Sequence, residues 1–274
     1  MVYWVRVVSL VPSMTETLLA SSIDVVGVTR YCEVDGYPII GGTKDPAIDR
    51  IVEIDPDLVI LDKHENRLED YEALIASGLT VFATSIASID DLDRDFSELN
   101  FKFHLALPVP SKEITGLHLT KYLSNREFPI TPCDPSGAVQ RPIRALVPIW
   151  RNPYMVINSH TYAGDLLRRI GVEVIGGISE YSKVDLDDFK SRVDVVLAPS
   201  EPYKFTKRQL PELTQVAPKV EFVDGKDLFW WGARTSSALI RLKAQLTHLV
   251  EELEEGTGNW PQAQSQQRQA QSFD

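Results

Sequence analysis

Two hydrophobic periods alternate along the first hundred residues. Short apolar runs rich in valine, isoleucine and leucine predict buried strands at 5–11, 25–29, 39–43, 58–61 and 80–83. The segments between them repeat apolar positions every three or four residues, which predicts helices at 14–21, 47–52, 67–77 and around 89–99. Because strands alternate with helices, we expect a parallel sheet with right-handed crossovers.

The first strand-to-helix turn is the earliest candidate for a ligand contact. Ser13 is a favourable N-cap residue, and Glu16 three residues later completes a capping-box pattern. Such a turn directs free backbone N–H groups beyond the carboxyl edge of the sheet, where open α/β sheets bind ligands. Ser13 is therefore a candidate ligand residue, although any α/β domain can begin with this strand, turn and helix.

A proline-rich segment, 100–142, interrupts this rhythm. The change in composition predicts the join between two lobes there, with one helix at 111–125. Alternating apolar residues at 101–107 also allow a short strand.

From residue 143 the alternation of strands and helices returns. Apolar runs predict strands at 144–149, 172–175, 193–197 and 220–223. Helical periods predict helices at 162–170, 186–191, 207–213 and 236–254, with a loop at 224–231. The fold class is therefore α/β: two similar lobes with mostly parallel sheets, joined by one helix, with a ligand cleft between them. The expected boundaries are 1–100 for the first lobe, 101–142 for the linker, 143–254 for the second lobe and 255–274 for a disordered tail rich in Gln and Ser.

Charge and cysteine content exclude several classes of function. The formal net charge of the 274 residues is −11, and no basic block is present, so the chain is not expected to bind nucleic acid. Cys32 and Cys133 lie far apart in sequence and are expected to be free thiols. No apolar run approaches the ~20 residues that span a bilayer. The first residues lack the pattern of a signal peptide, so the chain as written is expected in the cytoplasm; a chain whose signal had been removed would look the same.

Catalytic and metal-binding motifs are scarce. The sequence contains no GxSxG, Walker, GxGxxG or HExxH pattern, so we expect no enzyme activity. The histidines show no ligand spacing. His64, beside Glu65, is the best single candidate for a metal ligand, as an axial ligand to a metal already held in a chelate.

Aromatic and polar residues follow the predicted strands of both halves. Convergent aromatic side chains with a few charges suit a sizeable ligand held between lobes. Two adjacent tryptophans in a loop cannot both point into one core, so at least one is expected to be exposed or functional. The candidates in these loops are Tyr31, Lys44, Asp62, Asn66, Trp150, Tyr154, Tyr203, Trp230 and Trp231.

Taken together, these residues resemble a known family. Segments 8–16, 26–32, 41–43 and 51–60, with Asn66, resemble the iron-siderophore and vitamin B12 substrate-binding proteins of ABC importers, the class III or helical-backbone metal receptors. The resemblance covers the chain to about residue 254. Segments 199–203, 224–225 and 230–234 are similar to a subgroup described as cobalamin-binding-like.

The resemblance implies a fold, a ligand class and a set of contacts. It implies two lobes joined by the helix at 111–125, a shallow cleft and a small closure motion. It implies no built-in cofactor and a bound corrinoid or ferric siderophore-like chelate. It places second-lobe contacts at Tyr154, Tyr181 and 229–231, with Asp227 and Arg234 as polar partners. Tyr31 holds the position of a first-lobe aromatic that contacts the corrin, whereas Lys44 and Asp62 stand near the positions of two corrin-facing tryptophans.

Partners and alternatives follow from the same resemblance. Asp49 and Asp187 are the nearest matches to the acidic residues that dock on an ABC permease. The chain is expected to be a monomer, and it would be periplasmic if the family role holds and a signal has been removed. Two other functions remain open: a cytoplasmic enzyme or chaperone that reuses the fold for metal or cofactor handling, and a regulatory or interaction module that has lost its ligand.

Overall fold

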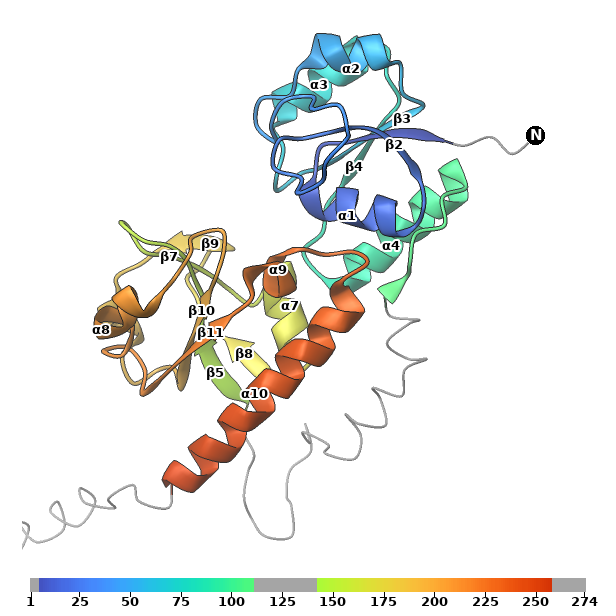
Figure 1. Ribbon diagram of the computed structural model, residues 1–274. Coiled ribbons are helices and arrows are strands. Elements are labelled where there is room, and N and C mark those ends of the chain that lie inside the picture. Colours follow the sequence, from blue (N-terminus) through green and yellow to red (C-terminus); the bar gives the residue numbers. More distant parts are fainter. Residues whose placement is uncertain (1–4, 111–141, 258–274) are drawn as a thin grey trace, which may run out of the picture.

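The computed structural model describes residues 5–110 and 142–257, with side chains described as far as residue 246. These residues form two α/β lobes (Figure 1). The expected α/β fold class is confirmed for the described residues. The helix predicted at 111–125 and Cys133 lie outside them, as does the predicted tail beyond residue 257.

A four-stranded parallel sheet forms the centre of the first lobe. Its spatial order is β2-β1-β3-β4. The strands are β1 (Arg6–Ser9), β2 (Asp24–Val28), β3 (Leu58–Asp62) and β4 (Val81–Thr84). The strand predicted at 39–43 is wrong, because this segment forms only isolated bridges. Gly41 has a φ of +103° there, and the sharp turn that follows ends the extended run.

Helices cover both faces of this sheet. They are α1 (Pro12–Ala20), α2 (Ile48–Ile54), α3 (Leu68–Ala76) and α4 (Ile89–Phe103). Successive strand residues point to opposite faces. Val7 therefore packs in one hydrophobic cluster with α1 and α4, whereas Val8 packs in another with α2 and α3. Because α4 continues to Phe103, the strand considered at 101–107 does not form.

The start of α1 differs from the expectation. Pro12 is the first helical residue and Val11 the N-cap, with no side-chain cap, so the capping-box interpretation of Ser13 and Glu16 is wrong. Proline favours the first helical position because its φ is already helical and its missing N–H has no partner to lose. Glu16 instead pairs with Arg234 of the second lobe, with Oε1 and Nη2 2.8 Å apart.

The second lobe contains two sheets. Strands β5 (Ile143–Leu146), β8 (Val172–Val174), β10 (Val195–Pro199) and β11 (Lys219–Val223) form a parallel sheet in the order β11-β10-β5-β8. A smaller antiparallel sheet contains β6 (Pro148–Trp150), β7 (Met155–Ile157) and β9 (Tyr181–Lys183). The sequence did not predict this smaller sheet. The strand predicted at 144–149 divides at Val147 between the two sheets.

Short helical turns and two longer helices complete the second lobe. They are α7 (Tyr162–Arg168), η1 (Leu186–Phe189), η2 (Lys207–Gln209), α8 (Leu210–Leu213), α9 (Gly225–Phe229) and α10 (Thr235–Thr257). The predicted helices at 186–191 and 207–213 are partly 3₁₀, and α9 occupies a predicted loop. Figure 1 shows α10 running from the junction between the lobes along the second lobe.

One hydrophobic cluster crosses from lobe to lobe. It joins residues of α1 and α4 with residues of α7, α9 and α10. At its centre the rings of Phe96 and Trp231 meet edge to face, with centroids 6.2 Å apart. The backbone N–H of Ile89 donates to Oδ2 of Asp165 across the same junction, at 3.1 Å. The lobes are therefore packed directly against each other at this junction.

Candidate functional site

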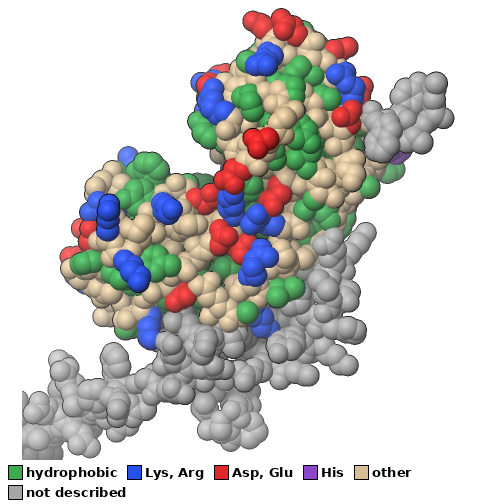
Figure 2. Space-filling view, viewed as in Figure 1, with side chains coloured by type: hydrophobic (Ala, Val, Ile, Leu, Met, Phe, Trp, Pro, Cys, Tyr) green, Lys and Arg blue, Asp and Glu red, His purple; other side chains and the backbone are tan. Residues whose placement is uncertain are grey.

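Loops of the two lobes face each other beside this junction. Nδ1 of His64 lies 3.7 Å from Oε2 of Glu180, and Nζ of Lys226 contacts Oε2 of Glu33. Acidic and basic side chains gather where the lobes meet (Figure 2). We call this region the interlobe site. It comprises Glu33, Lys44, His64, Glu65, Glu180, Tyr181, Glu201, Lys226 and Trp230.

We call the first-lobe side of the interlobe site the first-lobe wall. Asn66 connects the loops that form it. Its Nδ2 donates to the carbonyl oxygens of Leu10, at 3.2 Å, and Thr43, at 2.8 Å. Its Oδ1 accepts from the backbone N–H of Asp62, at 2.8 Å. One buried amide thus ties three loops that follow strands β1, β2 and β3. The residue that the sequence singled out as a ligand contact has its polar atoms bonded to backbone.

Asp62 stabilises the same wall through hydrogen bonds of its buried carboxylate. Its carboxylate accepts from the backbone N–H of His64 and from Oγ1 of Thr84, both at 2.8 Å. Burial raises the pKa of Asp62, and these hydrogen bonds oppose that rise. Asp62 therefore shapes the turn that presents His64 and Glu65.

Glu65 is a titratable residue of the first-lobe wall. It was not among the predicted ligand residues. No hydrogen bond or ion pair joins its carboxylate to another described side chain. Burial, with smaller contributions from the charges of Asp62 and Glu201, raises the pKa of Glu65 to about 7 against the opposing charge of Lys44. The neighbouring His64 lies 3.7 Å from Glu180, so the turn that carries Glu65 faces the second lobe. The sequence feature that could have identified Glu65 as a site residue is its position three residues after the end of β3.

Replacing Glu65 with glutamine is expected to remove part of the pH dependence of stability. An acid whose pKa rises on folding stabilises the folded state fully below its unfolded value of 4.5, and this contribution is lost as pH rises through 7. From pH 4.5 to 8 the free energy of unfolding of the wild type should fall by about 2 kcal/mol relative to Glu65→Gln, with allowance for partial exposure. Urea unfolding of both proteins across this range measures it. A difference that does not change with pH would contradict the assignment.

Tyr181 and Glu201 form the opposite wall. Tyr181 is 47% exposed, and partial desolvation together with the carboxylates of Glu180, Asp62 and Glu65 raises its pKa to about 12. Glu180, directly before β9, contacts His64, so the start of this strand faces the first lobe. Burial likewise raises the pKa of Glu201, which lies two residues after β10.

Trp230 closes one end of the interlobe site. Lys226 Nζ lies 4.6 Å from the centre of its ring system, and Cζ of Arg234 lies 5.7 Å from it. Its indole also hydrogen-bonds to Glu201, which lowers the pKa of that carboxyl. Trp230 is half-buried rather than exposed, and its role as the functional member of the tryptophan pair stays a prediction.

A second aromatic group lies on the second lobe. Trp150 and Tyr203 meet edge to face, with centroids 5.7 Å apart, and Tyr203 continues to Phe205 at 4.8 Å. Trp150 is 47% exposed. The hydroxyl of Tyr154 donates to Oε2 of Glu212, at 2.5 Å. Trp150 and Tyr203 therefore offer aromatic surface, while the polar atom of Tyr154 is engaged within the lobe.

Three predicted ligand residues are engaged in the junction instead. Trp231 is 5% exposed and packs on Phe96. Asp227 is 3% exposed and accepts from Arg241 at 2.6 and 2.7 Å. Arg234 joins Asp227 to Glu16 of the first lobe. Trp231, Asp227 and Arg234 therefore hold the lobes together instead of facing a ligand.

The remaining first-lobe candidates are divided between core and surface. Ser13 is buried, and its Oγ has no hydrogen-bond partner, so it lies beneath the site surface. Tyr31 is 54% exposed, with Cζ of Arg30 5.7 Å from its ring centre. Lys44 is exposed and near enough to Glu65 to lower its pKa. Tyr31 and Lys44 are thus accessible to a ligand.

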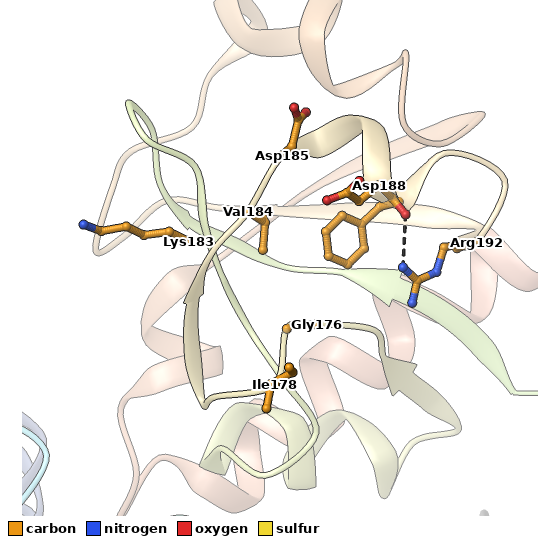
Figure 3. A pocket seen from close by; sticks show the side chains of 9 residues that line it. Gly176, Ile178, Lys183, Val184, Asp185, Asp188 and Arg192 are labelled. Atoms are coloured by element: carbon orange, nitrogen blue, oxygen red, sulfur yellow. Dashed lines mark hydrogen bonds between the residues drawn. The ribbon is translucent and has the colours of Figure 1, made fainter.

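A separate hollow lies on the second lobe (Figure 3). Its volume is about 710 Å³, and Gly176, Ile178, Lys183, Asp185 and Arg192 are among its lining residues. The charged side chains of Lys183, Asp185 and Arg192 point in different directions (Figure 3). None of the predicted ligand residues lines it.

The two predicted docking residues are both at the surface. Asp49 is exposed in the first turn of α2. Asp187 lies in η1 and pairs with Lys190 at 2.8 Å. Within the described residues, no group of three or more His, Cys, Asp or Glu side chains is placed to hold a metal ion. No helix in that part of the chain has the length and apolar content needed to cross a bilayer.

Three solved structures of binding proteins share this two-lobed fold. The periplasmic vitamin B12 binding protein BtuF of Vibrio cholerae matches with a TM-score of 0.67 and 18% identity, over 88% of this chain and 96% of that chain. The periplasmic heme-binding protein BhuT, in complex with two hemes, matches with 0.66 and 17%, over 89% and 98%. IsdE of S. aureus, complexed with heme, matches with 0.65 and 15%, over 88% and 98%.

The likeness concerns the fold. No protein-family model matches the sequence, and no curated protein matches it either. At these identities the structural matches show that the chain has the fold shared by these periplasmic binding proteins, as the sequence resemblance implied.

Proposed function

We propose that this chain binds a metal chelate between its lobes without transforming it, as a substrate-binding protein of an ABC importer or a relative of one. The ligand class is a corrinoid, a heme or a ferric siderophore-like chelate, since the structural neighbours include B12 and heme binders. The chelate would bring its own metal. No cofactor of the protein is needed for this function.

The observation that carries this proposal is the interlobe site itself. Tyr181 begins β9, and Glu65, Glu201 and Trp230 lie in loops, on the facing sides of the two lobes. Aromatic side chains provide rigid contact surface for a flat macrocycle, and a few polar groups fix its orientation. Tyr31 and Trp150 extend the available aromatic surface.

Ligand entry would require the loops to separate. The contacts of Lys226 with Glu33 and of His64 with Glu180 bridge the two walls. Partly exposed ion pairs of this kind contribute little stability, about 1 kcal/mol or less each. A corrin or porphyrin could therefore displace them at small cost, while the junction around Phe96 and Trp231 stays packed.

A permease partner would use surfaces outside this site. Asp49 and Asp187 belong to different lobes and are exposed. A permease with basic residues at matching positions could pair with both. This part of the proposal rests on the family resemblance.

The function is tested by titration of the purified chain with cyanocobalamin, hemin and ferrichrome, followed by tryptophan fluorescence and by equilibrium dialysis. Saturable binding of at least one chelate at one per chain is expected. Tyr181→Ala should weaken that binding about tenfold, because a buried aromatic contact is worth about 1–1.5 kcal/mol.

Ile75→Ala is the matched control. Ile75 is an exposed apolar residue of α3, so this truncation should leave the affinity unchanged. No binding of any of the three chelates would refute the proposed function. Equal weakening by both variants would remove Tyr181 from the site.

A further inference from the structure

Lys226 reaches across the interlobe site from a fixed position on the second lobe. The N–H of the preceding residue, Gly225, donates to Oγ of Ser200 at 2.9 Å. The backbone N–H of Lys226 donates to Oδ1 of Asp224 at 2.9 Å. Its ammonium lies 4.6 Å from the centre of the Trp230 ring system, and its side chain is 23% exposed. Backbone and side-chain contacts together hold the charge of Lys226 at one place in the site.

Glu33, the partner of Lys226 on the first lobe, is held much less firmly. It lies in the loop that follows β2, and its side chain is 69% exposed. Within residues 5–110 and 142–246, its carboxylate makes no ion pair or hydrogen bond other than the contact with Nζ of Lys226. Separation of the loops would therefore release Glu33 into solvent and leave the ammonium of Lys226 beside Trp230.

The neighbouring charged residues do not take the place of this pair. A Cβ on Gly225 would lie 2.5 Å from Cγ of Glu201, so Glu201 packs against the residue next to Lys226. Lys226 nevertheless pairs with Glu33 of the other lobe, and among the described side chains no ion pair joins it to Glu201. Lys44, the other lysine of the interlobe site, is exposed, so water screens its charge more strongly.

We propose that Lys226 binds an acidic group of the ligand, and that Glu33 is an internal competitor for that position. The inference rests on the proposed function and specifies its ligand as a chelate that carries a carboxylate. The carboxylate of such a ligand replaces that of Glu33 when the ligand enters. A ligand without an acidic group would displace Glu33 and leave a partly desolvated ammonium unpaired, which disfavours its binding.

The chemistry around Lys226 suits this role. A hydrogen bond between an ammonium and a carboxylate is stronger than one between neutral groups. The ring of Trp230 beside the ammonium provides apolar contact surface for the rest of the ligand. The net charge of the chain is −11, so its overall field disfavours acidic ligands. A preference for an acidic ligand would therefore report a local contact and not a general attraction.

Three pairs of chelates test the inference, one for each ligand class of the proposed function. Cyanocobalamin is paired with its e-monocarboxylic acid, in which one propionamide is a propionate. Hemin is paired with its diamide, in which both propionates are propionamides. Ferrichrome is paired with ferrichrome A, whose acyl groups carry carboxylates. Equilibrium dialysis at pH 7.5 measures each affinity, and the acidic member of a bound pair should bind about fivefold more tightly.

Two substitutions separate the roles of the ion-paired residues. Lys226→Met keeps an unbranched side chain beside Trp230 and removes its charge, so the ratio of the two affinities should fall to about 1. Glu33→Gln removes the competitor and leaves Lys226 in place. It should therefore tighten the binding of both members about threefold and keep the preference for the acidic one.

Lys102→Met and Glu98→Gln are the matched controls. Lys102 pairs with Glu98 at 2.5 Å and lies 6.0 Å from the centre of the Phe82 ring. This group on α4 therefore repeats the ion pair and the ring contact outside the interlobe site. Neither control should change the affinities or the preference. Thermal unfolding shows whether the variants are folded.

The outcomes separate the two proposals. The pair that contains the chelate bound most tightly in the titration above decides. Equal affinity for its members or tighter binding of the member without the acidic group would overturn the inference and leave the proposed function standing. A preference that survives Lys226→Met, or binding that Glu33→Gln does not tighten, would do the same. If no chelate binds in that titration, both proposals are refuted.

Discussion

Replacing Gly232 with alanine is expected to lower the free energy of unfolding by about 3 kcal/mol. Gly232 has a φ of +110°, and a Cβ there would lie 2.0 Å from Oγ1 of Thr17. Thr17 cannot turn away cheaply, because this oxygen donates to the carbonyl of Ser13 and accepts from the N–H of Ala233. The backbone strain costs about 1 kcal/mol, and overpacking at a buried contact adds about 2 kcal/mol.

Gly36→Ala separates the two causes. Gly36 also has a positive φ, of +84°, but a Cβ there would meet no atom within 4 Å. This control should cost only the backbone strain, about 1 kcal/mol. Urea unfolding of both variants measures the difference. Equal destabilisation would show that the contact between Gly232 and Thr17 does not hold the lobes together.

Removing the carboxylate of Asp227 is the other change with a large expected effect. Asp227 is buried between Arg241 and Arg234. Burial raises its pKa, but the hydrogen bonds and charges of the two arginines lower it more. Asp227→Asn would leave two guanidinium groups without their common partner, which should cost about 2–3 kcal/mol at pH 7, with allowance for the exposed side of Arg241.

The pH dependence identifies the cause of this loss. A carboxyl whose pKa falls on folding stabilises the protein above its unfolded pKa of 3.8, and that contribution disappears as pH falls further. The difference between wild type and Asp227→Asn should therefore shrink below about pH 4. Asp35→Asn, at an exposed position, should change stability by less than ~0.5 kcal/mol. A constant difference between pH 3 and 7 would contradict the ionic role.

Sequence patterns predicted the parallel sheets because their strands are buried and β-branched. Val7, Val59 and Val196 lie in runs that only a strand buries on both faces. Strands β6, β7 and β9 have three residues each, too few for a period to appear. Helix α9 was missed for the same reason, since its five residues lie in a segment that reads as a loop.

The capping pattern at Ser13 and Glu16 shows how tertiary contacts override a local motif. The same residues fit a capping box, yet Pro12 starts the helix and Glu16 binds Arg234, 218 positions away. No local rule could have found that partner. A motif of four residues specifies a local hydrogen-bond pattern only when nothing distant competes for its side chains.

The candidate site was found in outline rather than in detail. Sequence reasoning placed Trp230 among the residues that follow the strands, and the family resemblance added Tyr181; both lie in the region defined as the interlobe site. It could not tell which tryptophan of the pair is buried, because that depends on how α9 meets Phe96 of the other lobe. It also passed over Glu65 and Glu201, whose importance arises only when the two walls face each other. As ligand residues, all of these stay predictions.

Native mass spectrometry shows directly whether the chain holds a chelate. The purified chain is incubated with an equimolar mixture of cyanocobalamin, aquacobinamide, hemin and ferrichrome, and its mass is recorded under non-denaturing conditions. Our account predicts a complex of one chain with one chelate, and loss of most of that complex in Tyr181→Ala but not in Ile75→Ala. A spectrum that contains only the ligand-free chain would contradict a chelate-binding function.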